Sequence, residues 1–276
     1  MAGHWFRAEA EIPLRVTFDT NTFDKVSRPS VYPNDAAHAD MVEIHEALRR
    51  RDVQGFVSDT ALTLEGIGVD HRATVFGGTI ARSSMAQTSD DTFTITITPE
   101  QPDRRPVHHK QAERFREAFG LGIRLLGAPR IGMPRAEEEF YAVEDPTQLG
   151  ERLDRYFNLA GEIERRGLGC RRAEVLAVRL AAGAPSSGPW FTSLGNAHDI
   201  HETREVGRAI AEWADGDSVA AHYAYGNDFF CTLDAGTGES KRGDPAILDA
   251  TNRAWLTAQF GVQFATISEL TGKFRK

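Results

Sequence analysis

The apolar positions in the first part of the chain follow strand and helix periods in turn. Residues 12–19 and 55–58 are short apolar runs typical of buried strands, and residues 35–51 carry apolar side chains at helical spacing. Asp59 or Thr60 suits the cap of a further helix. Strands that alternate with helices in this way predict a parallel sheet with helices on both faces. We therefore expect an α/β fold.

The same alternation returns near the C-terminus. The elements expected there are helices at 199–213, 217–225 and 245–260 and strands at 229–233 and 262–267. Pro245 suits a first helical turn, where its missing amide hydrogen is not needed. These elements extend the sheet that the first part of the chain predicts.

The middle of the chain breaks this alternation. Residues 92–98 alternate threonine with phenylalanine and isoleucine, which is typical of a half-exposed strand. Helices are expected at 108–126, 147–166 and 171–182. The pattern therefore predicts a mixed α+β segment between two parts of an α/β core.

The composition is that of an ordinary globular protein. The 276 residues, 41% of them hydrophobic and 26% charged, suffice for a sizeable core without disulfides. Of the two cysteines, Cys231 lies in an apolar run, which suits a reducing compartment. No apolar stretch approaches the roughly 20 residues of a membrane span, and the first residues do not resemble a signal peptide. We expect a soluble, cytoplasmic protein with no membrane partner.

The charge balance changes this picture little. A net charge of −8 argues against a strongly basic surface that holds nucleic acid through its phosphates. It does not exclude a nuclease, because acids gathered at a metal site contribute to that total. Small arginine groups lie beside acids at expected helix ends, where they fit solvated helix faces, with phosphate contacts as the alternative.

Four acidic residues stand where a metal site would need them. Asp19 ends the first strand and Asp234 ends the run at 229–233, and the carboxyl ends of parallel strands form the ligand-binding edge of an open sheet. Glu65 and Asp217 lie on the expected helices beside them. Carboxylates that converge repel one another unless a cation neutralises them, and oxygen ligands suit Mg²⁺ or Mn²⁺. The pattern predicts a metal-dependent nuclease site.

Each of these acids also has a purely structural interpretation. Asp19 and Asp234 fit turns, and Glu65 fits an exposed helix face. Asp217 fits a helix N-cap, and Asp215 is a rival for either role, that of the metal ligand or that of the cap.

A second cluster of potential ligands, at residues 198–202, is a weaker candidate. Its histidines lie three positions apart, whereas helical zinc-binding pairs lie at i and i+4. Asp199 makes a good helix cap, so we interpret the segment as a helix start on the surface.

The segment 217–234 carries the most specific motif of the chain. It reads DSVAAHYAYGNDFFCTLD, which joins an acidic helix start, small apolar residues, a D-x-F turn and a strand that ends in T-x-D. Together with the strand end at Asp19 and the helix that bears Glu65, this segment resembles the PIN domain, a family of α/β nucleases. The resemblance covers residues 12–70 and 195–270, so residues 71–194 are expected to be an inserted accessory subdomain.

The resemblance implies a three-layer α/β/α sandwich on a central parallel sheet and a Mg²⁺- or Mn²⁺-dependent endoribonuclease. The catalytic residues and metal ligands that it implies are Asp19, Glu65, Asp217 and Asp234. Asn21 is expected to orient Asp19 or a bound water, and Thr232 to place its hydroxyl near the metal or the phosphate.

The resemblance also implies partners and rival functions. RNA is the expected substrate. Many members of the family are toxins of bacterial toxin–antitoxin pairs, which makes an antitoxin, another protein partner or a homo-oligomer an expectation here. One alternative is a PIN-like scaffold that no longer cuts and acts by binding RNA or protein, although all four acids are present. The other is a structure-specific DNA nuclease, whose sites usually collect more acids than this chain offers.

Overall fold

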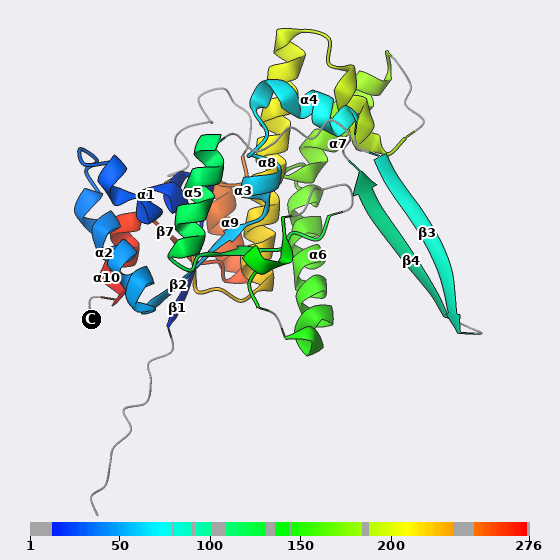
Figure 1. The fold of residues 1–276 in the computed structure, drawn as a ribbon. Helices are drawn as coiled ribbons and strands as arrows, with labels where there is room; N and C mark the ends of the chain where they lie inside the picture. Colours follow the sequence, from blue (N-terminus) through cyan, green and yellow to red (C-terminus); the bar gives the residue numbers. More distant parts are fainter. Residues whose placement is uncertain are drawn as a thin grey trace, which may run out of the picture.

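A five-stranded parallel sheet forms the centre of the protein (Figure 1). The computed structural model describes residues 13–78, 80–89, 92–100, 109–130, 136–143, 145–183, 188–233 and 246–274. In sheet order the strands are β5 (Arg124–Leu126), β2 (Val53–Ser58), β1 (Leu14–Phe18), β6 (Phe229–Cys231) and β7 (Phe264–Ala265). All four pairings between them are parallel. The expected strands at 12–19 and 55–58 are therefore confirmed, and the fold is α/β.

The strands bury side chains on both faces, as parallel strands that are covered by helices do. Val16 and Phe18 of β1 join one apolar core, while Phe56 of β2 and Phe230 of β6 join the other. All four side chains are buried. Each face therefore needs its own covering layer.

Helices supply these two layers (Figure 1). The core on one face receives side chains from α1 (Thr20–Ser27), α2 (His38–Arg50), α5 (His109–Gly120) and α10 (Ile267–Phe274). The core on the other face receives side chains from α4 (Val69–Gly77), α6 (Leu149–Arg165), α7 (Cys170–Ala181), α8 (Ile200–Ala224) and α9 (Ala250–Phe260). Within the described ranges, no helix is both long and apolar enough to cross a membrane.

Short elements complete the chain. They are the one-turn helix α3 (Thr60–Thr63) and the 3-10 turns η1 (Pro29–Val31), η2 (Glu138–Phe140), η3 (Pro146–Gln148) and η4 (Trp190–Asn196). The strands β3 (Ile80–Ser89) and β4 (Thr92–Glu100) pair antiparallel and form a ribbon that projects from the rest of the molecule (Figure 1). The ribbon confirms the strand expected at 92–98.

Residues 108–126 were expected to form one helix, and that prediction is wrong at its end. Helix α5 stops at Gly120, and Gly122 has a φ of +89°, a left-handed conformation that favours glycine. The chain then enters β5, which pairs with β2 at the edge of the sheet. A three-residue strand is too short to show a period of its own.

The division of the chain that the sequence suggested does not follow the sheet. Strand β5 lies inside the range 71–194, yet it belongs to the central sheet. The same range contains α6 and α7, which agree with the helices expected at 147–166 and 171–182.

Residues 200–224 form one helix, α8, where two helices were expected. Gly216 lies inside this helix, at a position where a Cβ would lie only 3.1 Å from the Cα of Gly169. Gly216 lets the segment before α7 pack closely against α8. Asp217 is therefore an interior helical residue and not an N-cap. Asp199 does cap the helix, as expected, by accepting hydrogen bonds from the amide groups of residues 201 and 202.

The C-terminal elements are shifted from their expected bounds. Strand β6 stops at Cys231, and β7 is followed at Ile267 by α10 rather than by more strand. Helix α9 begins at Ala250 with Asp249 as its cap, whereas Pro245 lies outside the described residues.

Candidate functional site

The direction of strand addition reverses at the middle of the sheet. From β1 the chain adds β2 and then β5 on one side, and it later adds β6 and then β7 on the other. Such a switch point leaves a crevice outside the carboxyl ends of the two central strands, where open α/β sheets bind ligands. Here the two strands are β1 and β6, so the residues that follow them form the candidate site.

Asp19 follows β1 and is buried, with only 6% of its surface exposed. Its amide group donates a hydrogen bond of 2.9 Å to the carbonyl oxygen of Cys231, which continues the β1–β6 pairing. One carboxylate oxygen accepts from the amide group of Thr20 at 2.7 Å and so caps α1. The other oxygen accepts from the hydroxyl of Thr232 at 2.7 Å. The Asp19 carboxylate is thus held in place at the switch point by the first residue of α1 and by the residue that follows β6.

Asn21 and Thr22 fasten the end of β6 to the first turn of α1. The side-chain oxygen of Asn21 accepts from the amide group of Leu233 at 3.1 Å, and the Thr22 hydroxyl donates to the carbonyl oxygen of Cys231 at 2.8 Å. These contacts hold the chain beside Asp19 up to the residue before Asp234. Asp234 itself lies outside the described residues.

Asp217 is engaged elsewhere, in a buried ion pair. It lies inside α8 with 1% of its surface exposed. One carboxylate oxygen accepts from Nε and Nη2 of Arg130 at 3.1 and 3.0 Å, and the other accepts from the indole of Trp213 at 2.8 Å. The second guanidinium edge of Arg130 pairs with Glu164 at 2.6 Å.

The electrostatics of this pair favour a charged arginine. Burial is the largest single effect and by itself lowers the pKa of the Arg130 guanidinium, but Asp217, Glu164 and other nearby acidic groups together raise that pKa above its ordinary value. The positive charge of Arg130 therefore already stands where a cation would neutralise Asp217.

Glu65 lies in the turn after α3, beside a second buried arginine. Its carbonyl oxygen accepts from Arg72 at 3.5 Å, and Arg72 also donates to the carbonyl oxygen of Gly207 in α8 at 2.7 Å. Burial lowers the pKa of Arg72, and the charge of Glu65 acts in the opposite direction. Within the part of the chain that the structure describes, no three His, Cys, Asp or Glu side chains form a group that could hold a metal ion.

Polar residues that the sequence did not single out surround the end of β2. Asp59 is 1% exposed, and its carboxylate accepts from the amide group of Ala128 at 3.1 Å and from the hydroxyl of Tyr141 at 2.9 Å. The Thr60 hydroxyl bonds to that of Ser58 at 2.9 Å and to that of Ser218 in α8 at 2.9 Å. Asp59 had been interpreted only as a helix cap, because its partners lie far away in the sequence.

Comparisons with known proteins found no relative. No protein-family model matches the chain, and neither the curated proteins nor the solved structures contain a match.

Proposed function

We propose that this protein is a metal-dependent nuclease that hydrolyses phosphodiester bonds of RNA at the carboxyl edge of its sheet. One observation carries the proposal: the Asp19 carboxylate is buried at the switch point between β1 and β6 and hydrogen-bonded to Thr232. A central parallel sheet with helices on both faces supports the PIN-like three-layer sandwich that the sequence resemblance implies.

The donors at this point suit a hard cation. The Asp19 carboxylate and the Thr232 hydroxyl are oxygen donors, and Mg²⁺ keeps several waters, so it needs only one or two carboxylates. Asp19 would bind the metal and Asp234 would be the second carboxylate, while Thr232 orients Asp19. When bound, the metal supplies an activated water and neutralises charge on the phosphate.

The ion pair of Asp217 changes the role that we propose for this residue. Because an arginine stays protonated in proteins, Asp217 would have to leave Arg130 before it could bind a metal. We assign Asp217 to holding α8 against the segment after β5. Glu65 stays a candidate ligand on the strength of the sequence alone.

The same ion pair favours a second candidate function. Because the pair with Arg130 withdraws one of the four acids that the resemblance implies as metal ligands, the second candidate is a scaffold whose carboxyl edge binds RNA or a protein without cutting. The two functions differ in whether the RNA is cleaved, so a cleavage assay separates them.

The test incubates the purified protein with mixed RNA and, separately, with single-stranded DNA in the presence of Mn²⁺, Mg²⁺ or EDTA. We expect metal-dependent cleavage of RNA that falls at least about 100-fold in Asp19→Asn, more than supporting residues usually cost. Asparagine also caps helices, so this variant should fold. Asp154→Asn, at an exposed position of α6, is the matched control and should cut as the unmodified protein does.

Two outcomes would contradict the proposal. If the folded protein cuts neither nucleic acid with any metal, the binding scaffold becomes the remaining candidate function. Cleavage of DNA but not RNA would point to the DNA nuclease.

A further inference from the structure

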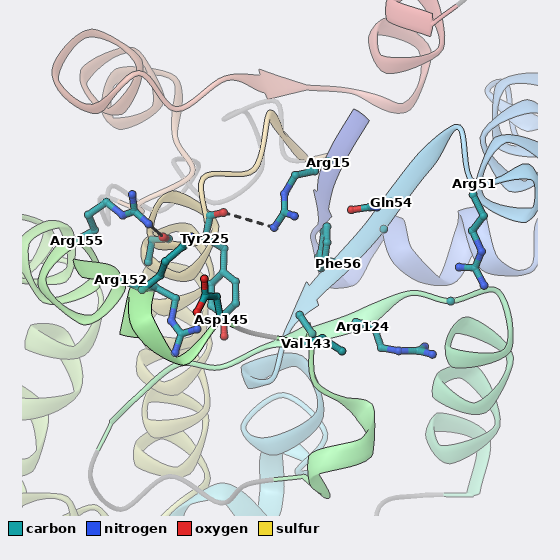
Figure 2. Close-up of a pocket in the computed structure, with 15 residues that line it drawn as sticks. Arg15, Arg51, Gln54, Phe56, Arg124, Val143, Asp145, Arg152, Arg155 and Tyr225 are labelled. Atoms are coloured by element: carbon teal, nitrogen blue, oxygen red, sulfur yellow. Dashed lines mark hydrogen bonds between the residues drawn. The ribbon is translucent and has the colours of Figure 1, made fainter. Parts of the chain in front are cut away.

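A pocket lies at the opposite, amino edge of the sheet and has a volume of about 540 Å³ (Figure 2). Its walls come from the first residues of β1, β2 and β5, from the segment around η3 and the start of α6, and from the end of α8. The volume falls within the range of roughly 300–1,000 Å³ that is usual for ligand sites. None of the residues assigned to the carboxyl-edge site lines it.

Arginine dominates this pocket. The arginines that line it are Arg15, Arg51, Arg124, Arg152 and Arg155. Asp145 is the one carboxylate among the described residues of the lining, and one of its oxygens already accepts the amide and hydroxyl hydrogens of Thr147. In a protein whose net charge is −8, this pocket is a local concentration of positive charge that attracts anions.

Neutral groups position these arginines. Arg15 donates from Nε to the side chain of Asn227 at 3.0 Å, and its guanidinium lies 4.8 Å from the ring centre of Phe56. Arg155 donates to the carbonyl oxygen of Ala224 at 2.7 Å. Asp228, which is close to Arg15 in space, accepts from the Arg15 main-chain amide at 2.7 Å. A guanidinium has five N–H donors, so these contacts leave others for a ligand.

Two further arginines of the pocket, Arg124 and Arg51, are held in a similar way. Arg124 donates to the carbonyl oxygens of Phe119 and Ile123 at 3.1 and 3.0 Å, and Arg51 donates to that of Leu121 at 3.3 Å. Figure 2 shows Arg15, Arg152 and Arg155 around Tyr225, with Arg51 and Arg124 farther along the pocket. Several guanidinium groups in one cavity suit a ligand with more than one negative charge, and their fork geometry matches phosphate oxygens.

An aromatic cavity of about 560 Å³ adjoins the arginine pocket and shares Arg152, Ala224 and Tyr225 with it. Its other walls include the rings of Tyr141 and Tyr156. The Tyr225 hydroxyl accepts from the amide group of Gly127 at 3.2 Å, which fixes this ring between the two cavities. Tyr156 is buried, whereas Tyr141 and Tyr225 are half-buried, and exposed parts of aromatic rings offer faces on which a nucleobase stacks.

We propose that the two cavities together form a nucleotide-binding site, in which the arginines bind the phosphates and the tyrosine-lined cavity takes the base. A free nucleoside diphosphate and the 5′-phosphorylated end of an RNA share this chemistry. The site lies apart from the carboxyl edge and does not depend on nuclease activity there.

The test measures equilibrium binding of adenosine and guanosine diphosphate, pyrophosphate and adenosine by calorimetry, with EDTA present so that a metal at the carboxyl edge does not contribute. We expect saturable binding of at least one diphosphate, at least about tenfold tighter than pyrophosphate, and weaker binding as salt rises. Adenosine alone should not bind measurably.

Variants locate the binding. Arg155 lies at an exposed position. We expect the Arg155→Gln variant, and also the double variant Arg15→Gln with Arg155→Gln, to bind the diphosphate at least about tenfold more weakly. Arg49→Gln, an exposed arginine of α2 outside both cavities, should bind normally. Asp19→Asn should also bind normally, which separates this site from the proposed nuclease centre.

The outcomes that would overturn the proposal are concrete. They are no saturable binding at low salt, equal binding by the Arg155→Gln variant, and loss of binding in Asp19→Asn. Competition by a 5′-phosphorylated oligoribonucleotide, but not by its 5′-hydroxyl form, would identify an RNA end as the ligand. Absence of such competition would identify the free nucleotide.

Discussion

Asp19 and Asp217 are both buried carboxylates, yet different chemistry stabilises each of them. Amide and hydroxyl groups donate to Asp19, whereas a guanidinium neutralises Asp217. A buried charge that loses its partner destabilises a protein far more than a lost neutral hydrogen bond does. The same change from aspartate to asparagine should therefore have unequal effects at the two positions.

We expect Asp217→Asn to lower the free energy of unfolding by about 3 kcal/mol, because it leaves the half-buried Arg130 with Glu164 as its one remaining carboxylate among the described residues. Asp19→Asn should cost about 1 kcal/mol or less, because asparagine keeps the cap of α1. Urea unfolding of both variants measures the difference.

A double variant, Asp217→Leu with Arg130→Met, serves as the control. Because it removes both charges, it should recover part of the lost stability. Equal losses of stability in Asp217→Asn and Asp19→Asn would mean that the Asp217–Arg130 pair does not hold the fold.

At the scale of elements, glycines decide how closely α8 approaches its neighbours. Gly216 lies inside α8, where alanine has the higher helix propensity by about 1 kcal/mol. A Cβ there would nevertheless lie 3.1 Å from Gly169 and 3.6 Å from the side chain of Ile163. Packing and propensity therefore oppose each other at this position.

We expect packing to prevail, so that Gly216→Ala lowers the free energy of unfolding by about 1–3 kcal/mol. Gly161 is the matched control, because it lies inside α6 and a Cβ there would meet nothing within 4 Å. Gly161→Ala should raise stability by up to about 1 kcal/mol. Thermal and urea unfolding of the two variants measure these opposite changes in stability. A stabilised Gly216→Ala variant would show that the close approach of Gly169 to α8 is not needed.

At the scale of the whole molecule, one buried carboxyl links three distant segments. Glu212 of α8 is 5% exposed and accepts from the amide groups of Gly169, at the start of α7, and Ile247, before α9, at 3.4 and 2.9 Å. Burial raises the pKa of Glu212 to about 7 in spite of these hydrogen bonds. The protonated carboxyl is therefore the form that the folded protein favours.

This raised pKa makes stability depend on pH. The folded pKa of about 7 exceeds the ordinary value of 4.5, so the contribution of Glu212 to stability is fully present below 4.5 and is lost as pH rises through 7. From pH 5 to pH 8, the free energy of unfolding of Glu212→Gln should rise by up to about 3 kcal/mol relative to that of the unmodified protein. This follows because one unit of pKa difference corresponds to about 1.4 kcal/mol.

Urea unfolding at the two pH values measures this gain, with Glu113→Gln at an exposed position of α5 as the control. The buried His222, whose pKa burial lowers to about 3, contributes equally to variant and parent and cancels in the comparison. No change in relative stability between pH 5 and pH 8 would show that Glu212 is ionised in the folded protein.

Local patterns were enough to predict much of the α/β core. The apolar runs at 12–19 and 55–58 and the helical spacing at 35–51 predicted β1, β2 and α2, because each period is set by neighbours a few positions apart. The position of Asp19 at the end of a buried strand was readable in the same way. The rule that strand ends meet at one edge of a parallel sheet placed Asp19 near the end of the run at 229–233, whereas its hydrogen bond with Thr232 is a finding of the structure.

Contacts between distant residues decided the rest. Gly216 and Asp217 read locally as a helix boundary, but packing against Gly169 and pairing with Arg130 made them interior residues of α8. The arginines at the amino edge come from segments that no spacing in the sequence connects. The sequence by itself determined the segments whose hydrophobic period is visible locally, among them β1, β2 and α2. Only the tertiary structure decided which buried charges face one another, because the free energy of a buried charge depends on its partner in space.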